Sequence, residues 1–63
     1  MNNHQKRALE YIANTGGKPS INWFDDDHDP VGPMLRADLV AAELAVEEDG
    51  YIMAIAAHDK AIK

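Results

Sequence analysis

Apolar residues recur at helical spacing near the start of the chain. They lie three and four positions apart, which places them on one face of a helix, and they are Ala8, Leu9, Tyr11 and Ile12. Asn2 or Asn3 can cap this helix, and Asn2 with Gln5 has the spacing of a reciprocal capping box. The glycine pair at 16–17 lets the chain leave the helix through a left-handed conformation. The pattern predicts a helix over residues 3–14.

Within residues 18–24, the side chains at 21–23 alternate between apolar and polar, a pattern long enough for a strand of three or four residues. Ile21 and Trp23 would share one face of a strand, with Asn22 on the other, and β-branched and aromatic residues favour strands. We therefore predict a short strand here. Trp23 and Phe24 would then point to opposite faces. One of them is expected in the core, and the other either marks a contact site or is covered by the C-terminal tail.

Carboxylates and prolines separate this strand from a second predicted helix. Residues 25–33 carry four carboxylates within five positions and two prolines around a glycine, which predicts a loop. Pro33 suits the first position of a helix, where its missing N–H costs nothing. Helical spacing and alanine content then predict a helix over residues 33–45. Met34 and Met53 are interpreted as core residues.

A β-hairpin is predicted next. Asp49-Gly50 lies between two β-prone runs, and a type I′ turn needs positive φ at both central residues, which Asp and Gly tolerate. The strands are expected over residues 45–48 and 51–55. Residues 57–63 are expected to add a short helical turn. All of these elements are assigned to a single small domain, residues 1–63.

This order of elements resembles a reduced winged helix-turn-helix domain. The stretch Leu35–Met53 is similar to the recognition helix and wing of small winged-helix regulators, and Gln5–Ile12 is similar to their first helix. In that family a further helix precedes the recognition helix, whereas residues 22–32 are predicted as a loop. The expected fold is α+β and winged-helix-like, in the order helix, short strand, helix, β-hairpin and C-terminal helical turn. The resemblance implies DNA binding, with Arg36 as the residue that would read a base.

The composition limits what so short a chain can do. It has 63 residues, 46% of them hydrophobic, and no cysteine, so one small core without disulfides must support the fold. A ligand pocket of ~300 Å³ or more is hard to enclose with so few residues, and no nucleophile motif surrounds Ser20 or Thr15. We therefore expect no enzyme activity and no cofactor. Glu10 interrupts the apolar run of an export signal, and no window has the ~18 apolar residues of a membrane span, so a cytoplasmic protein is expected.

Negative charge is concentrated in the middle of the sequence. The net charge is −5, and residues 25–49 alone hold nine carboxylates against Arg36, a balance of −8. These carboxylates are Asp25, Asp26, Asp27, Asp29, Asp38, Glu43, Glu47, Glu48 and Asp49. Such a segment would be repelled by DNA phosphates and attracted to a basic protein surface.

An acidic loop also raises the question of a metal. The spacing that opens an EF-hand loop is matched by Asp25, Asp27 and Asp29. The sixth position of that loop would be Pro30 where glycine is required, and the twelfth would be Arg36 where glutamate is required. His28 has no second histidine at ligand spacing. We interpret the segment as a solvated acidic loop and expect no metal site.

Three functions follow from the sequence. The leading one is a non-catalytic module whose acidic residues bind a basic protein partner, without a membrane. In size and charge the chain resembles small accessory proteins of bacteriophages and mobile elements. Some of these, such as anti-CRISPR proteins and other DNA mimics, inhibit a host enzyme that binds nucleic acid. The alternative is a winged-helix, DNA-binding transcription regulator, and a third interpretation is a homo-oligomer with Trp23 or Phe24 at a two-fold interface.

Overall fold

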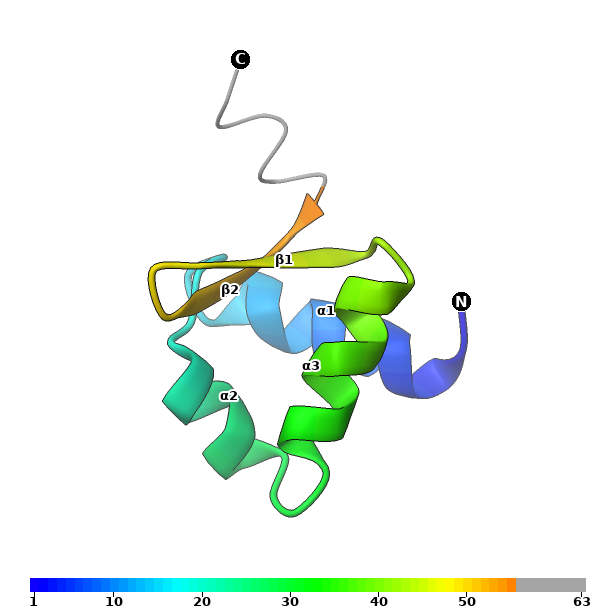
Figure 1. The fold of residues 1–63 in the computed structure, drawn as a ribbon, viewed down its shortest axis with the longest axis horizontal. Helices are drawn as coiled ribbons and strands as arrows, with labels where there is room; N and C mark the ends of the chain where they lie inside the picture. Colours follow the sequence, from blue (N-terminus) through cyan, green and yellow to red (C-terminus); the bar gives the residue numbers. More distant parts are fainter. Residues whose placement is uncertain (56–63) are drawn as a thin grey trace.

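The computed structural model describes residues 1–55. These residues form three helices followed by a two-stranded antiparallel sheet, an α+β arrangement (Figure 1). The elements are α1 (Asn3–Asn14), α2 (Ile21–Asp27), α3 (Gly32–Ala41), β1 (Ala45–Glu48) and β2 (Tyr51–Ala54). The predicted helical turn at 57–63 lies outside the described residues.

Helix α1 confirms the first predicted helix and its cap. Asn2 Oδ1 accepts the backbone N–H of Gln5 at 2.8 Å, and Gln5 Oε1 accepts that of Asn2 at 2.9 Å. The two bonds satisfy N–H groups that a helix leaves unpaired at its start. At the other end, the N–H of Gly17 donates to the carbonyl of Ile12 at 2.8 Å, and Gly16 and Gly17 both have positive φ. These two residues turn the chain out of the helix.

The strand predicted over residues 18–24 is wrong, because helix α2 begins within it. Ser20 caps the helix by accepting the backbone N–H of Trp23 at 3.1 Å. Phe24 is fully buried and Trp23 is 66% exposed, since neighbouring helical residues point about 100° apart. One aromatic is therefore buried and one exposed, as predicted, although a helix rather than a strand separates them.

The backbone at Pro19 and Ser20, just before α2, pairs with β2, and Ser20 is extended. Ser20 forms an isolated antiparallel bridge with Tyr51, and the N–H of Ile52 donates to the carbonyl of Pro19 at 3.0 Å. The chain thus touches the edge of β2 before it turns into the helix.

The loop predicted over residues 25–33 is shorter than expected. Asp25–Asp27 form the last turn of α2, and α3 begins at Gly32. Pro33, predicted as the first residue of the helix, is therefore its second. The two helices approach closely at this point. A Cβ added to Gly32 would lie 2.6 Å from Asp25 Cα, which a real Cβ does not do. Glycine is therefore required where α3 starts.

Helix α3 ends at Ala41, before the predicted boundary at residue 45. The N–H of Leu44 donates to the carbonyl of Leu39 at 2.9 Å, and that of Glu43 donates to Val40 at 3.0 Å. This is the bonding of a Schellman cap, in which the residue after the cap is left-handed. Glu43 takes that position with a φ of 59°. Because glycine usually fills this position, a glutamate here does not mark the end of a helix.

The hairpin is confirmed. Asp49 and Gly50 have φ of 52° and 81°, and the strands pair in the register Glu48↔Tyr51. Both central residues of the turn thus have the positive φ of type I′.

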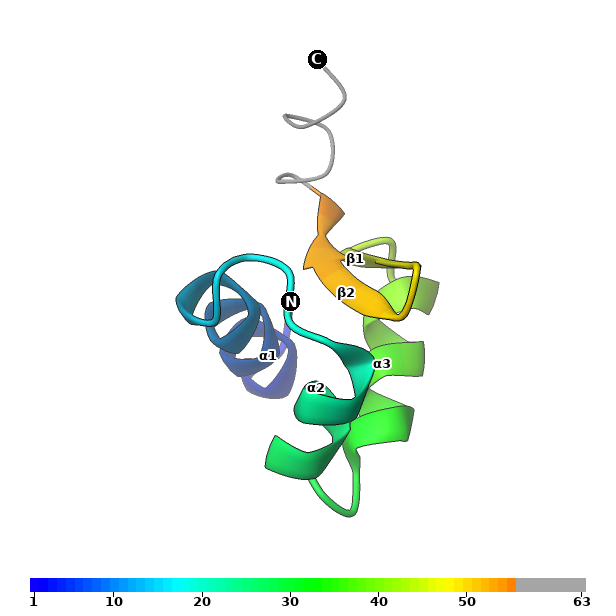
Figure 2. The same ribbon diagram turned by 90° about the vertical axis from the view of Figure 1, so that its left-hand side faces the viewer.

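The core lies between the three helices and one face of the sheet (Figure 2). Strand β1 contacts α3, and strand β2 contacts α1 and α2. The fully buried apolar residues are Ala8, Ile12, Phe24, Leu39, Ala45 and Ile52. Each element contributes at least one of them, so the hairpin is packed into the domain along with the helices.

Candidate functional site

Arg36 joins three elements of the fold through its guanidinium. From α3 it donates Nε–H to Asp25 Oδ1 at 2.6 Å and Nη2–H to Asp25 Oδ2 at 2.8 Å, both on α2. Its Nη1 donates to Glu47 Oε2 on β1 at 2.8 Å. We call this set of three residues the Arg36 clamp. Only 18% of the arginine side chain is exposed.

The electrostatics of the Arg36 clamp favour the charged forms of Asp25 and Arg36. The guanidinium hydrogen bonds hold the pKa of Asp25 below its usual range, and the two carboxylates raise that of Arg36 further. A bidentate arginine–carboxylate pair is also strong and directional. Arg36, the residue that the sequence resemblance singled out for base contact, is thus bound to carboxylates of its own chain.

Two other predicted site residues are held by hydrogen bonds to α1. Tyr11 donates its hydroxyl to Asp27 Oδ2 at 2.5 Å, and this bond, with burial, raises the pKa of Tyr11 to about 12. Gln5 Nε2 donates to Asp38 Oδ2 at 3.2 Å. Asp38 therefore faces α1, whereas Arg36 on the same helix faces α2 and β1.

The remaining predicted site residues are exposed and lie apart along the fold. They are Asp26 on α2, Asp29 in the following loop, Glu43 in the turn after α3, and Glu48 and Asp49 at the hairpin tip. The structure brings Asp25 and Glu47 together at the Arg36 clamp, but it gathers the nine carboxylates into no single cluster.

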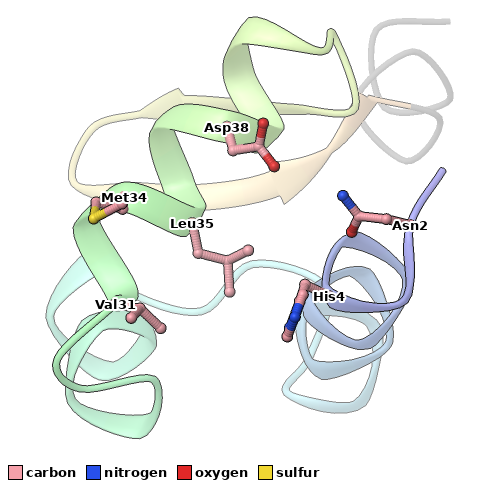
Figure 3. Close-up of a pocket in the computed structure, with 6 residues that line it drawn as sticks. All are labelled: Asn2, His4, Val31, Met34, Leu35 and Asp38. Atoms are coloured by element: carbon pink, nitrogen blue, oxygen red, sulfur yellow. The ribbon is translucent and has the colours of Figure 1, made fainter.

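An open groove lies between the start of α1 and the first half of α3 (Figure 3). Its volume is about 410 Å³, and it is lined by Asn2, His4, Val31, Met34, Leu35 and Asp38. Met34 is 74% exposed and Val31 51% exposed, while Leu35 packs against the core. The assignment of Met34 to the core is wrong, because Leu35 and Leu39 set the buried stripe of α3 and Met34 lies about 100° from Leu35.

A second hollow lies on the outer side of α2. Its volume is about 330 Å³, and Trp23, Asp26 and Asp27 line it. The sequence analysis anticipated an exposed aromatic residue but assigned no hollow to it. These three residues have the spacing i, i+3, i+4, which places them side by side on a helix. Because a strand was predicted here, this spacing was not recognised.

The side chains considered for metal binding and catalysis have structural surroundings in the described part of the chain. Within residues 1–55, no group of three or more His, Cys, Asp or Glu side chains is placed to hold a metal. The hydroxyl of Ser20 caps α2, and His28 packs against Phe24 with its Nδ1 2.7 Å from the Phe24 carbonyl. Nor does any helix in this part of the chain combine the length and apolar character needed to cross a membrane.

Comparison with known proteins adds no relative: no family model, curated protein or solved structure matches this chain. The groove between α1 and α3, the hollow on α2 and the Arg36 clamp are the features of the described residues that bear on function.

Proposed function

We propose that this protein is a non-catalytic module that binds a basic protein partner. The main support is the Arg36 clamp. Residues 25–49 hold nine carboxylates and Arg36 as their only Lys or Arg, and that arginine is bonded to Asp25 and Glu47. Residues 25–49 therefore have no Lys or Arg side chain available to bind a DNA phosphate, and affinity for DNA depends on such contacts.

The architecture we propose for it is winged-helix-like. Three helices precede the hairpin, and the extended backbone at Ser20 meets β2 as a first strand would. Helix α2 supplies the element that residues 22–32 were expected to lack. In this arrangement α3 is the recognition helix. Its exposed side chains include Met34, Ala37, Asp38 and Val40, none of which is a cation.

The groove between α1 and α3 is the contact surface best suited to a protein. Exposed Met34 and Val31 offer apolar area, and Asp38 stands at one end of the groove as an acceptor for a lysine or arginine (Figure 3). Apolar anchors surrounded by polar groups are typical of protein interfaces. The net charge of −5 favours encounter with a basic partner.

Inhibition of a host nucleic-acid-binding enzyme, as by a phage-type DNA mimic, is one form of this function. Exposed carboxylates on α2 and the hairpin would then meet cations that normally hold phosphates. The same chemistry suits any basic protein surface, so the proposal names the class of partner and no single enzyme.

The test compares DNA with a protein partner directly. Fluorescence anisotropy with random duplex DNA at physiological salt should detect no binding. A partner captured from lysate on immobilised protein should associate more slowly with Asp26→Lys, because Asp26 is exposed on α2. The matched control Glu10→Lys, on α1, should change the association rate less.

The competing function is a DNA-binding regulator, which the element order favours. Tight, salt-sensitive binding of duplex DNA by the unaltered protein would overturn our proposal in its favour. Our proposal would also be overturned if the association rate with the partner did not change with salt concentration and was the same for the parent, Asp26→Lys and Glu10→Lys proteins.

A further inference from the structure

Trp23 is a large aromatic side chain that remains mostly in water. It is 66% exposed, whereas Phe24 beside it is fully buried. The indole lines the hollow on α2 with Asp26 and Asp27, one helical turn further along. An exposed aromatic residue in a hollow is typical of a contact site.

Contacts with α1 hold this hollow in place. The hydroxyl of Tyr11 donates to Asp27 Oδ2 at 2.5 Å and lies 3.5 Å from the backbone carbonyl of Trp23. One oxygen of Asp27 is thereby fixed, and its carboxylate is oriented before any ligand arrives. Preorganised acceptors lower the entropic cost of binding.

No cation of the described chain fills the hollow. The ion pairs within residues 1–55 are those of Arg36 with Asp25 and Glu47. Lys18 lies over the ring of Tyr51, with its Nζ 5.2 Å from the ring centroid. Asp26 makes no side-chain hydrogen bond or ion pair in this part of the chain.

We infer that the hollow binds an arginine side chain of the partner protein, a step that rests on the proposed function and names the chemistry of its partner. A guanidinium is flat and weakly hydrated, so it stacks on an indole, and its N–H groups reach carboxylates at its edge. Two carboxylates beside Trp23 supply the complementary charge. A lysine ammonium lacks the flat donor fork and is more strongly hydrated.

The test needs no knowledge of the partner. Trp23 is the only tryptophan in the chain, so its fluorescence and its indole N–H resonance both report on the hollow. The probes are three end-blocked tripeptides, Gly-X-Gly, in which X is arginine, lysine or citrulline. Citrulline keeps the shape of arginine and removes its charge.

The arginine tripeptide should give a saturable change in both signals. The lysine tripeptide should bind about three-fold more weakly, and the citrulline tripeptide should give no saturable change. Asp26→Asn should weaken arginine binding about three-fold. Glu43→Gln, which removes the same charge after α3, should leave it unchanged.

Equal responses to arginine and citrulline would overturn the inference, as would an Asp26→Asn protein that binds arginine like the parent. Failure of the proposed function appears elsewhere, as DNA binding or as a charge-insensitive partner complex. The tripeptide experiment can therefore fail while the proposed function holds, and the two failures can be distinguished.

Discussion

At the scale of single residues, Tyr11 has an environment that differs strongly from water. Its hydroxyl donates to the carboxylate of Asp27, so loss of the phenolic proton would bring a phenolate within 2.5 Å of that carboxylate. Its ring also lies edge-on to Phe24 and His28, with centroid distances of 5.8 and 4.9 Å. The residue thus connects α1 to α2 through both its ring and its oxygen.

The Tyr11–Asp27 bond can be tested by titration in a Tyr51→Phe background, which leaves Tyr11 as the only tyrosine. Ultraviolet absorbance should show a midpoint at about 12, and Asp27→Asn should move it towards 10.0, the ordinary tyrosine value. The folded pKa is raised, so this bond stabilises the protein below pH 10 and its contribution is lost as pH rises towards 12. If the midpoint were the same in the Asp27→Asn protein, burial alone would account for the raised pKa of Tyr11.

Residues whose conformation depends on local chemistry were predictable from the sequence. Asn2 and Gln5 form hydrogen bonds with each other's backbone N–H, so their spacing was enough to locate the start of α1. Asp49 and Gly50 tolerate positive φ, so this pair was enough to locate the hairpin turn. The Arg36 clamp was not predictable in this way. It joins residues eleven positions apart in each direction, and helix packing brings them together.

At the scale of elements, the Arg36 clamp is the polar connection between α2, α3 and β1. Breaking one partner of a partly buried pair leaves the other charge without compensation. We predict that Arg36→Met lowers the free energy of unfolding by about 1–3 kcal/mol, measured by urea denaturation. Arg7→Met, at an exposed position of α1, is the matched control and should change it by less than about 0.5 kcal/mol. Equal effects of the two variants would mean that the Arg36 clamp contributes nothing to stability.

The Arg36 clamp also predicts a dependence on acid. The pKa of Asp25 is lowered in the folded state, so its contribution is complete above the ordinary carboxyl value of 3.8 and is lost as pH falls below it. Arg36→Met should therefore lose less stability than the parent protein between neutral pH and pH values under 3.8. Parallel pH curves for the two proteins, measured by urea denaturation, would contradict this.

Packing between α2 and α3 gives a further prediction. Gly32→Ala would place a methyl group 2.6 Å from Asp25 Cα and 3.0 Å from its carbonyl oxygen, so the helices must separate. We expect a loss of about 1–3 kcal/mol and a shifted Arg36 Nε–H resonance. Gly16→Ala has open space and a φ of +84°, so it should cost about 1 kcal/mol and leave that resonance in place. An unshifted resonance in Gly32→Ala would show that the contact relaxes without moving the Arg36 clamp.

The errors in the predicted elements have physical causes of the same kind. Residues 21–23 alternate in polarity like a strand, but a strand would leave Phe24 on the face opposite Ile21, whereas a helix turns both inward. Helix α3 stops at a glutamate in a left-handed conformation, which no residue-level rule favours. At residues 21–24 tertiary burial thus outweighs local preference.

At the scale of the whole molecule, self-repulsion opposes the stability of so small a core. Residues 1–55 hold ten Asp and Glu residues and four Lys and Arg residues, and two of the carboxylates are paired with Arg36. The other carboxylates spread over α1, α2, α3 and the hairpin, and they lie closer together in the folded state than in the unfolded chain. The excess of acidic residues therefore costs the protein some stability.

This cost should be visible as a salt dependence of folding. Raising sodium chloride from ~0.01 to ~0.15 M shortens the Debye length from ~30 to ~8 Å, which screens exposed carboxylates more than the partly buried Arg36 clamp. We predict that the free energy of unfolding rises by up to about 1 kcal/mol. Urea must be the denaturant, because guanidinium chloride is itself a salt. Asp26→Lys should be at least as stable as the parent at low salt and gain less from added salt, since one repulsive charge is already reversed. If salt instead lowered the stability of the parent, the attraction within the Arg36 clamp would outweigh the repulsion among the remaining carboxylates.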